Sequence, residues 1–141
     1  MRAIVLIGGE GTRLRPLTWR TPKQLVPILN RPLLEQLLSQ LQVHGFQHVT
    51  FAMNSPNQAI EDSFGNGAKL DLKIERVYEG APLGSGGAIA NASQDWNVPF
   101  LVCNGDIVSN IDLTAFAESH RTRNAKLSLA LYEVQDPSRY G

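Results

Sequence analysis

The sequence predicts an α/β fold built on a doubly wound, mostly parallel sheet with helices on both of its faces. Short apolar runs alternate with amphipathic helical patterns along the chain, and the connections between them are short. Strands that alternate with helices in this way form a parallel sheet covered by those helices. The 141 residues are enough for one domain with a substantial core.

The first half of the chain begins with a strand and continues with the clearest helix. Residues 2–7 form a short apolar run that stops at glycines, which is typical of a buried strand. Residues 32–44 are predicted as a helix because their leucines fall on one face. Pro32 suits the first turn of this helix, and Gly45 suits its end. The alternation then repeats, with an expected strand and an expected helix at 48–53 and 57–64.

The second half of the chain continues the same alternation. We expect a strand, a helix and a further strand at 70–78, 86–93 and 99–103. A helix is predicted at 112–122, where Asp112 is placed to cap the first turn. A last apolar run predicts a strand at 127–134.

Composition and charge exclude several classes of function. The chain has no net charge, which argues against general binding to nucleic acid or to membranes. The basic residues are unevenly placed, however: residues 1–31 hold six basic side chains and one acidic one. Such a locally basic segment suits a small polyanionic ligand. Cys103 is the single cysteine and no apolar run reaches the ~18 residues of a membrane span, so we expect a reducing, cytoplasmic setting.

A glycine-rich segment directly follows the first strand. Gly8, Gly9 and Gly11 leave backbone N–H groups open to an anion, and basic side chains follow at Arg13, Arg15 and Lys23. The spacing matches neither the Walker A loop nor the glycine fingerprint of dinucleotide-binding sheets. The segment therefore predicts an extended triphosphate-binding loop.

This segment carries a resemblance to a known family. The run from Gly8 to Thr18, followed by Pro22-Lys23, resembles the signature of the sugar-phosphate nucleotidyltransferases. Two later segments, Glu79 to Ala88 and Asn104-Gly105-Asp106, agree with that pattern. Ligands of doubly wound sheets collect beyond the carboxyl ends of the strands, so we expect the three segments to meet in one cleft.

The resemblance implies a reaction and a set of residues that perform it. A sugar-1-phosphate oxygen attacks the α-phosphorus of a nucleoside triphosphate, and pyrophosphate leaves. Arg13 and Lys23 are implied to bind the phosphates and Asp106 to bind Mg²⁺, which makes these three the expected catalytic residues. The expected nucleotide-binding residues also include the loop and the base-binding segment: Gly8, Gly9, Gly11, Thr12, Glu79 and Gly84.

Two residues bear on the choice of nucleotide. A carboxylate at Glu79 can accept both donors on the Watson–Crick edge of guanine, which favours GTP. The first motif also resembles that of the mannose-1-phosphate guanylyltransferases, so mannose-1-phosphate is the favoured sugar substrate. Gln24 favours the alternative, a glucose-1-phosphate thymidylyltransferase, because Pro-Lys-Gln is closer to those enzymes.

Members of the family continue beyond the point that corresponds to residue 141. We therefore expect residues 1–141 to be the amino-terminal, nucleotide-binding part of a Rossmann-like nucleotidyltransferase domain, with a sheet incomplete at its carboxyl end. An exposed sheet edge would favour a homo-oligomer or pairing with another chain. The alternative to an enzyme is a nucleotide-binding module without turnover.

Overall fold

The computed structural model describes residues 1–9, 11–136 and 138. The chain divides into two compact units, Met1–Asn110 and Ile111–Gly141.

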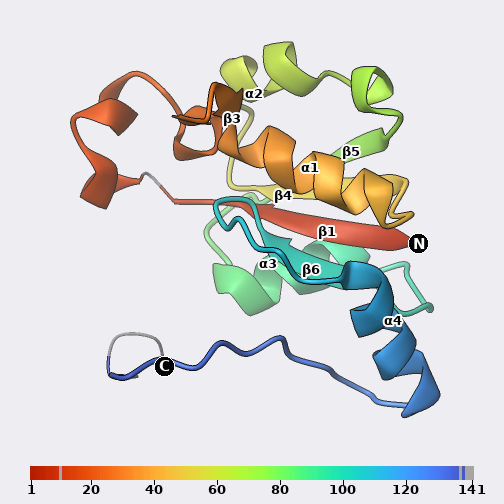
Figure 1. The fold of residues 1–141 in the computed structure, drawn as a ribbon. Coiled ribbons are helices and arrows are strands. Elements are labelled where there is room, and N and C mark those ends of the chain that lie inside the picture. The colour runs from red at the N-terminus through yellow and green to blue at the C-terminus, as the bar shows by residue number, and fades with distance from the viewer. Residues whose placement is uncertain (10, 137, 139–141) are drawn as a thin grey trace. The chain divides into compact units, whose positions relative to one another are not determined.

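The first unit is built on four parallel strands (Figure 1). In sheet order these are β5 (Lys73–Tyr78), β4 (His48–Met53), β1 (Arg2–Ile7) and β6 (Leu101–Asn104). Strand β1 pairs with β4 on one side and with β6 on the other. The chain thus runs outward from β1 to β5 and returns to add β6 on the opposite side, which confirms the doubly wound parallel sheet.

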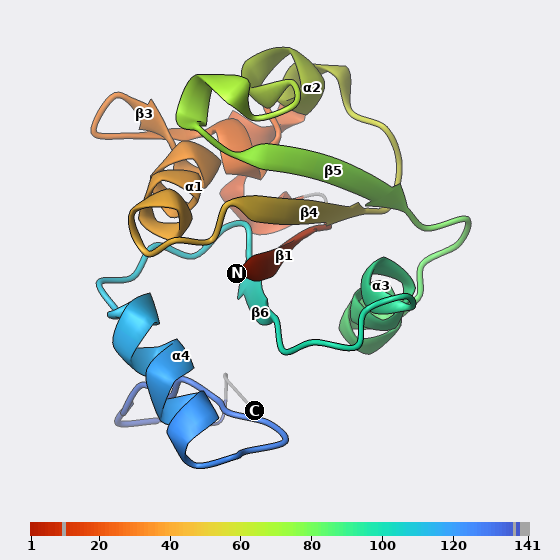
Figure 2. The same cartoon turned by 90° about the vertical axis from the view of Figure 1, so that its right-hand side faces the viewer.

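Helices cover both faces of this sheet (Figure 2). Helices α1 (Leu33–Val43) and α2 (Gln58–Phe64) lie on one face, and α3 (Gly84–Ser93) lies on the other. Successive strand side chains point to opposite faces, so strands with both faces covered are apolar throughout. This is why the central strands β1 and β4 are mostly apolar, whereas β5, at the edge of the sheet, carries Lys73, Glu75 and Arg76.

Each face has its own core. The five leucines of α1 that the pattern placed on one face are all buried: Leu33, Leu34, Leu37, Leu38 and Leu41. On the same side, the rings of Phe51 and Phe64 meet edge to face with centroids 6.4 Å apart. The core under α3 is made of smaller side chains, since Ile4 and Ala52 pack against Ala88 and Ala92. Small residues let α3 approach the sheet closely.

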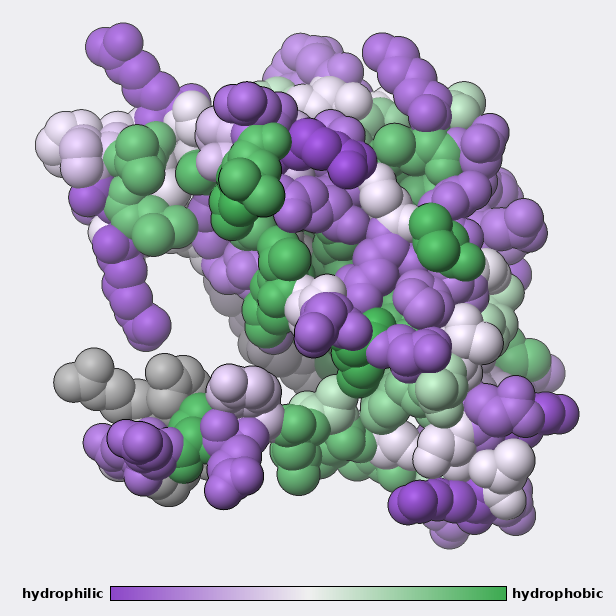
Figure 3. All heavy atoms as spheres, in the orientation of Figure 1, coloured by the Kyte–Doolittle hydropathy of each residue, from purple (hydrophilic) through white to green (hydrophobic). Residues whose placement is uncertain are grey.

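The segment between β1 and α1 is irregular. It contains three short 3₁₀ turns and a two-stranded hairpin: η1 (Thr12–Leu14), η2 (Leu17–Trp19), η3 (Lys23–Leu25), β2 (Pro27–Ile28) and β3 (Arg31–Pro32). Large apolar side chains are exposed here, and Figure 3 shows hydrophobic spheres in this region at the upper left. A fourth turn, η4 (Ala68–Leu70), precedes β5, so the strand predicted from residue 70 begins at Lys73.

The second unit contains helix α4 (Leu113–Thr122). The Asp112 carboxylate accepts a hydrogen bond from the Ala115 N–H at 2.9 Å, as expected for a helix cap. The strand predicted at 127–134 is wrong: this stretch is extended but belongs to no sheet, and Leu131 is 88% exposed. A β pattern becomes a strand only where a partner completes its hydrogen bonds, and no described segment pairs with it. No described helix has the length and apolarity to cross a membrane.

Candidate functional site

A cavity of about 270 Å³ opens beyond the carboxyl ends of the strands, on the face covered by α3. Leu6, Ala52 and Ala88 form its apolar floor. Its walls come from the segments that follow β1, β4, β5 and β6 and from the first turn of α3. The three predicted segments therefore meet in one cleft, as the parallel topology requires.

The glycine loop forms one wall, and its backbone is folded tightly. Gly11 has φ +61°, in the left-handed region, and a Cβ there would lie 3.0 Å from Thr18 Cγ2 and 3.2 Å from Lys23 Cβ. The Thr18 hydroxyl donates a hydrogen bond to the Gly11 carbonyl at 2.7 Å. Glycine is thus required both by conformation and by space. The turn it makes brings Lys23 back beside the strand end.

Lys23 and Asp106 meet at the cavity. Lys23 lies in η3, and Asp106 follows β6. The ammonium Nζ lies 2.6 Å from the carboxylate Oδ2, and the two side chains are 18% and 35% exposed. Their segments are far apart in the chain, so this ion pair forms only when the sheet brings β1 and β6 together.

Glu79 occupies the opposite side, between β5 and α3. Its N–H donates to the Met53 carbonyl at 2.9 Å, which extends the β4–β5 ladder by one bond. Its carboxylate Oε2 accepts a hydrogen bond from the Leu83 N–H at 2.8 Å. The carboxylate is thereby held at the amino end of α3, where the helix dipole favours negative charge.

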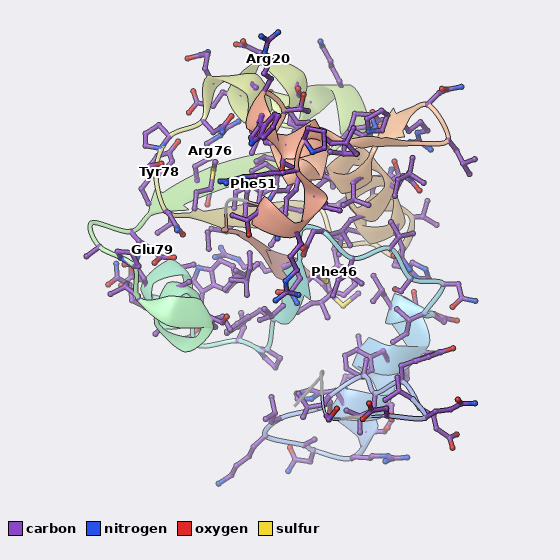
Figure 4. The ribbon with its side chains drawn as sticks, turned by 90° about the vertical axis from the view of Figure 1, so that its left-hand side faces the viewer. Arg20, Phe46, Phe51, Arg76, Tyr78 and Glu79 are labelled. Atoms are coloured by element: carbon purple, nitrogen blue, oxygen red, sulfur yellow. The ribbon has the colours of Figure 1, made fainter. Side chains whose placement is uncertain are left out.

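Residues 78 and 79 point to different elements (Figure 4). The Tyr78 hydroxyl donates to Glu61 of α2 at 3.1 Å, whereas Glu79 lies beside α3. Burial raises the pKa of Tyr78, and the hydrogen bond to Glu61 adds to this effect. Tyr78 is therefore a neutral structural group. Glu79, the residue that follows β5, is the one that lines the cavity.

The structure separates the predicted site residues into two groups. Six line the cavity: Gly8, Gly9, Lys23, Glu79, Gly84 and Asp106. Gly11, Thr12 and Arg13 are not among the residues that line it: they follow in the loop and in η1, and the Arg13 side chain is exposed. Glu10, inside the same motif, lies outside the described residues.

Sequence reasoning missed one amide in the cavity wall, Asn54, and gave another, Asn104, only as part of a motif and not as a binding residue. Asn54 directly follows β4, and its Oδ1 lies 3.3 Å from where a Cβ on Gly8 would stand. Asn104 is the last residue of β6. The rule that ligands collect at the carboxyl ends of parallel strands would have found both, had it been applied to every strand.

Gln24 and Cys103 do not add reactive groups to the cavity. Gln24 is 4% exposed and buried outside the cavity wall. Burial raises the pKa of the Cys103 thiol to about 11, so the thiol is neutral near pH 7 and a poor nucleophile. The polar groups that line the cavity are one ammonium, two carboxylates, two amides, the Ser85 hydroxyl and glycine backbone, which suits binding of a charged ligand.

Comparison with known proteins identifies the family of this chain. A family model described as nucleotidyl transferase matches residues 2–141. A mannose-1-phosphate guanylyltransferase of Mycobacterium tuberculosis is 43% identical over 140 residues, which are 99% of this chain and 39% of that protein. Mannose-1-phosphate guanylyltransferase 1 of Arabidopsis thaliana is 35% identical over 146 residues, covering this whole chain and 40% of that protein.

A solved structure shows the same fold. HddC from Yersinia pseudotuberculosis, complexed with GMP-PN, superposes with a TM-score of 0.73 at 33% identity. The match covers 84% of this chain and 53% of HddC. The present chain thus spans about two fifths of the curated relatives' length and about half of this structural neighbour.

Proposed function

The chain belongs to the nucleotidyltransferase family, and on this premise we propose that it is the amino-terminal, nucleotide-binding part of a mannose-1-phosphate guanylyltransferase. In the proposed reaction a phosphate oxygen of mannose-1-phosphate attacks the α-phosphorus of GTP. The bond from that phosphorus to the β-phosphate breaks, and pyrophosphate leaves. The observation that carries the proposal is the meeting of Lys23 and Asp106 in a cavity that the glycine loop and Glu79 also line.

The loop and its cations would hold the triphosphate. Such a transfer needs positioning and charge neutralisation rather than a protein nucleophile. The N–H groups of Gly8 and Gly9 offer donors at the cavity wall, and Lys23 places a point charge beside them. The exposed Arg13 would close over the outer phosphates, because its guanidinium can bind two oxygens at once. Thr12 would contribute a neighbouring donor in the same turn.

Asp106 would hold a divalent cation, which we propose is Mg²⁺. The described residues contain no group of three or more His, Cys, Asp or Glu side chains that could bind a metal alone. Mg²⁺ is commonly held by one or two carboxylates together with substrate phosphates, and a single carboxylate at the phosphate end of the cavity fits that arrangement. When bound, the cation would neutralise charge that develops on the phosphates.

Glu79 would select the base, and Asn54 would form a second hydrogen bond to it. Guanine presents two adjacent donors, N1–H and N2–H₂, and one acceptor, O6. The Glu79 carboxylate complements the donors, and an amide such as Asn54 can donate to the acceptor. Gly84 would let the base lie close to the backbone. The alternative is a glucose-1-phosphate thymidylyltransferase, which the Pro-Lys-Gln motif favours; Gln24 itself is buried and is not among the residues that line the cavity.

Three further properties belong to the same proposal. Strand β6 pairs with β1 alone among the described strands, so its free edge could support a homo-oligomer or pairing with another chain. The single unpaired thiol, Cys103, suits the cytoplasm. Turnover is proposed for the whole protein, and nucleotide binding for residues 1–141.

Calorimetric titration tests the proposal directly. The chain is titrated with GTP, dTTP and UTP in Mg²⁺, together with an Arg13→Ala variant. Arg20→Ala is the matched control, because Arg20 is an exposed arginine of the same loop that lies far from Glu79 in Figure 4. We expect GTP to bind selectively, Arg13→Ala to lose most of that affinity, and Arg20→Ala to retain it. Absence of nucleotide binding, or equal binding of all three nucleotides, would overturn the proposal.

A further inference from the structure

We propose that the Lys23–Asp106 ion pair couples the binding of nucleotide to the binding of the divalent cation. This inference rests on the proposed function, because it takes the triphosphate as the ligand of Lys23 and the cation as the ligand of Asp106. The two side chains are each other's partners at 2.6 Å. Lys23, which the triphosphate needs, is therefore already bound to Asp106, which the cation needs.

The Lys23–Asp106 ion pair is placed so that either ligand must break it in order to bind. The Lys23 side chain is 18% exposed and the Asp106 side chain is 35% exposed, so the ammonium is partly shielded from water while the carboxylate remains open to it. The Lys23 backbone is fixed by the Val26 N–H, which donates to its carbonyl at 3.2 Å, and its Cβ lies against Gly11. The turn that carries Asp106 is also fixed, since the Gly105 N–H donates to the Leu6 carbonyl at 2.9 Å. Both ends of the pair thus start from ordered backbone.

A ligand that arrives alone must separate this pair and leave one charge without its partner. Nucleotide alone would draw Lys23 toward phosphate and leave Asp106 facing a polyanion. Cation alone would bind Asp106 and leave Lys23 beside a second positive charge. When both ligands arrive together, the pair is broken once and both charges regain opposite partners. Coupling of this kind is reciprocal and typically amounts to about 5- to 150-fold in affinity.

The test compares GTP binding in EDTA and in Mg²⁺ for four proteins: the natural chain, Asp106→Asn, Lys23→Met and the double variant. In EDTA we expect Asp106→Asn to bind GTP about tenfold more tightly than the natural chain, at the lower end of typical coupling. The reason is that Lys23 is released. In Mg²⁺ the order should reverse, because the cation has lost its carboxylate. Melting curves of all four chains establish that each is folded.

The double variant separates coupling from simple removal of a negative charge. If Lys23 is the released group, Asp106→Asn should add clearly less affinity in EDTA when Lys23 is already methionine, because only the repulsion between the Asp106 carboxylate and the phosphates is then removed. The same gain on both backgrounds would mean that charge alone explains the effect, and the coupling would be wrong. Failure of Asp106→Asn to gain affinity in EDTA would also overturn it. In both of these cases the proposed function stands if the natural chain binds GTP in Mg²⁺; if it binds no nucleotide, both proposals fall.

Should Asp106→Asn not fold, Lys23→Met alone provides a mirror measurement. Removing the ammonium abolishes the barrier to the cation, so the ratio of GTP affinities with and without Mg²⁺ should fall about tenfold relative to the natural chain. An unchanged ratio would contradict the coupling.

Discussion

Replacing Gly11 by alanine tests how the glycine loop positions Lys23. Gly11 has φ +61°, and its missing Cβ would stand 3.0 Å from Thr18 Cγ2 and 3.2 Å from Lys23 Cβ. Gly45, which ends α1, provides a matched control, because it has φ +79° with nothing within 4 Å of its Cβ position. The two substitutions share the backbone strain, and only Gly11→Ala adds the crowding.

The expected magnitudes differ accordingly. A left-handed non-glycine residue costs roughly 1–2 kcal/mol, which both variants incur. Forcing a methyl into a packed site adds typically about 1–3 kcal/mol, which only Gly11→Ala incurs. At roughly 3 °C per kcal/mol for a chain of this size, Gly45→Ala should melt about 3–6 °C below the natural chain. Gly11→Ala should melt about 6–15 °C below it.

Thermal unfolding and GTP titration measure the two consequences separately. We expect Gly11→Ala to weaken GTP binding, because its new methyl pushes Lys23 away by tenths of an ångström. Gly45→Ala should bind GTP as the natural chain does. Equal melting temperatures for the two variants would refute the crowding argument. Unchanged GTP affinity in a folded Gly11→Ala chain would refute the role of the turn in placing Lys23.

Three other substitutions test the core, the base site and the buried thiol. Leu38→Ala should lower the free energy of unfolding by about 2–5 kcal/mol in urea titration, because Leu38 is fully buried. Val43→Ala, on the exposed face of the same helix, is the control and should change it by less than about 0.5 kcal/mol. Glu79→Gln should weaken GTP by about tenfold or more in calorimetry while dTTP changes little, since an amide offers one acceptor where guanine needs two. Burial raises the pKa of Cys103 from 9.0 to about 11 in the folded chain. The folded state therefore keeps a proton that the unfolded state loses, and stability should fall by about 2 kcal/mol between pH 9 and 11, a component that Cys103→Ala should lack in urea titrations across that range.

Local pattern was sufficient to predict most of the first unit. Strands β1 and β4 occupy the predicted residues, and α1 lies within one residue of its expected bounds. These elements have either continuous apolar runs or a clear helical stripe, and both signals are carried within a few residues. The stretch 127–134 has a comparable pattern and forms no strand. Pairing is a property of two segments, and one segment's pattern cannot supply it.

The candidate site was predictable in outline and not in its contacts. Loops after parallel strands converge by topology, so Glu79 and Asp106 could be placed at one cavity from the strand assignments alone. The 2.6 Å contact between Lys23 and Asp106 depends on side-chain positions set by packing, which no motif encodes. Gln24 is a second example, because its place in the motif says nothing of its burial, and packing leaves it only 4% exposed.

The strand order also bears on how the chain folds. Strand β1 can pair with β4 once the first 53 residues exist, but its other neighbour begins at Leu101. Contacts between segments so far apart in sequence close a long loop, and such contacts form late and slow the search. We therefore expect β1, β4 and β5 to assemble first and β6 to pair with the free edge of β1 afterwards. Asp106 follows β6 by two residues, so its contact with Lys23 can form only after β6 has docked. A spectroscopic probe at this contact would therefore measure the rate of the final step of assembly.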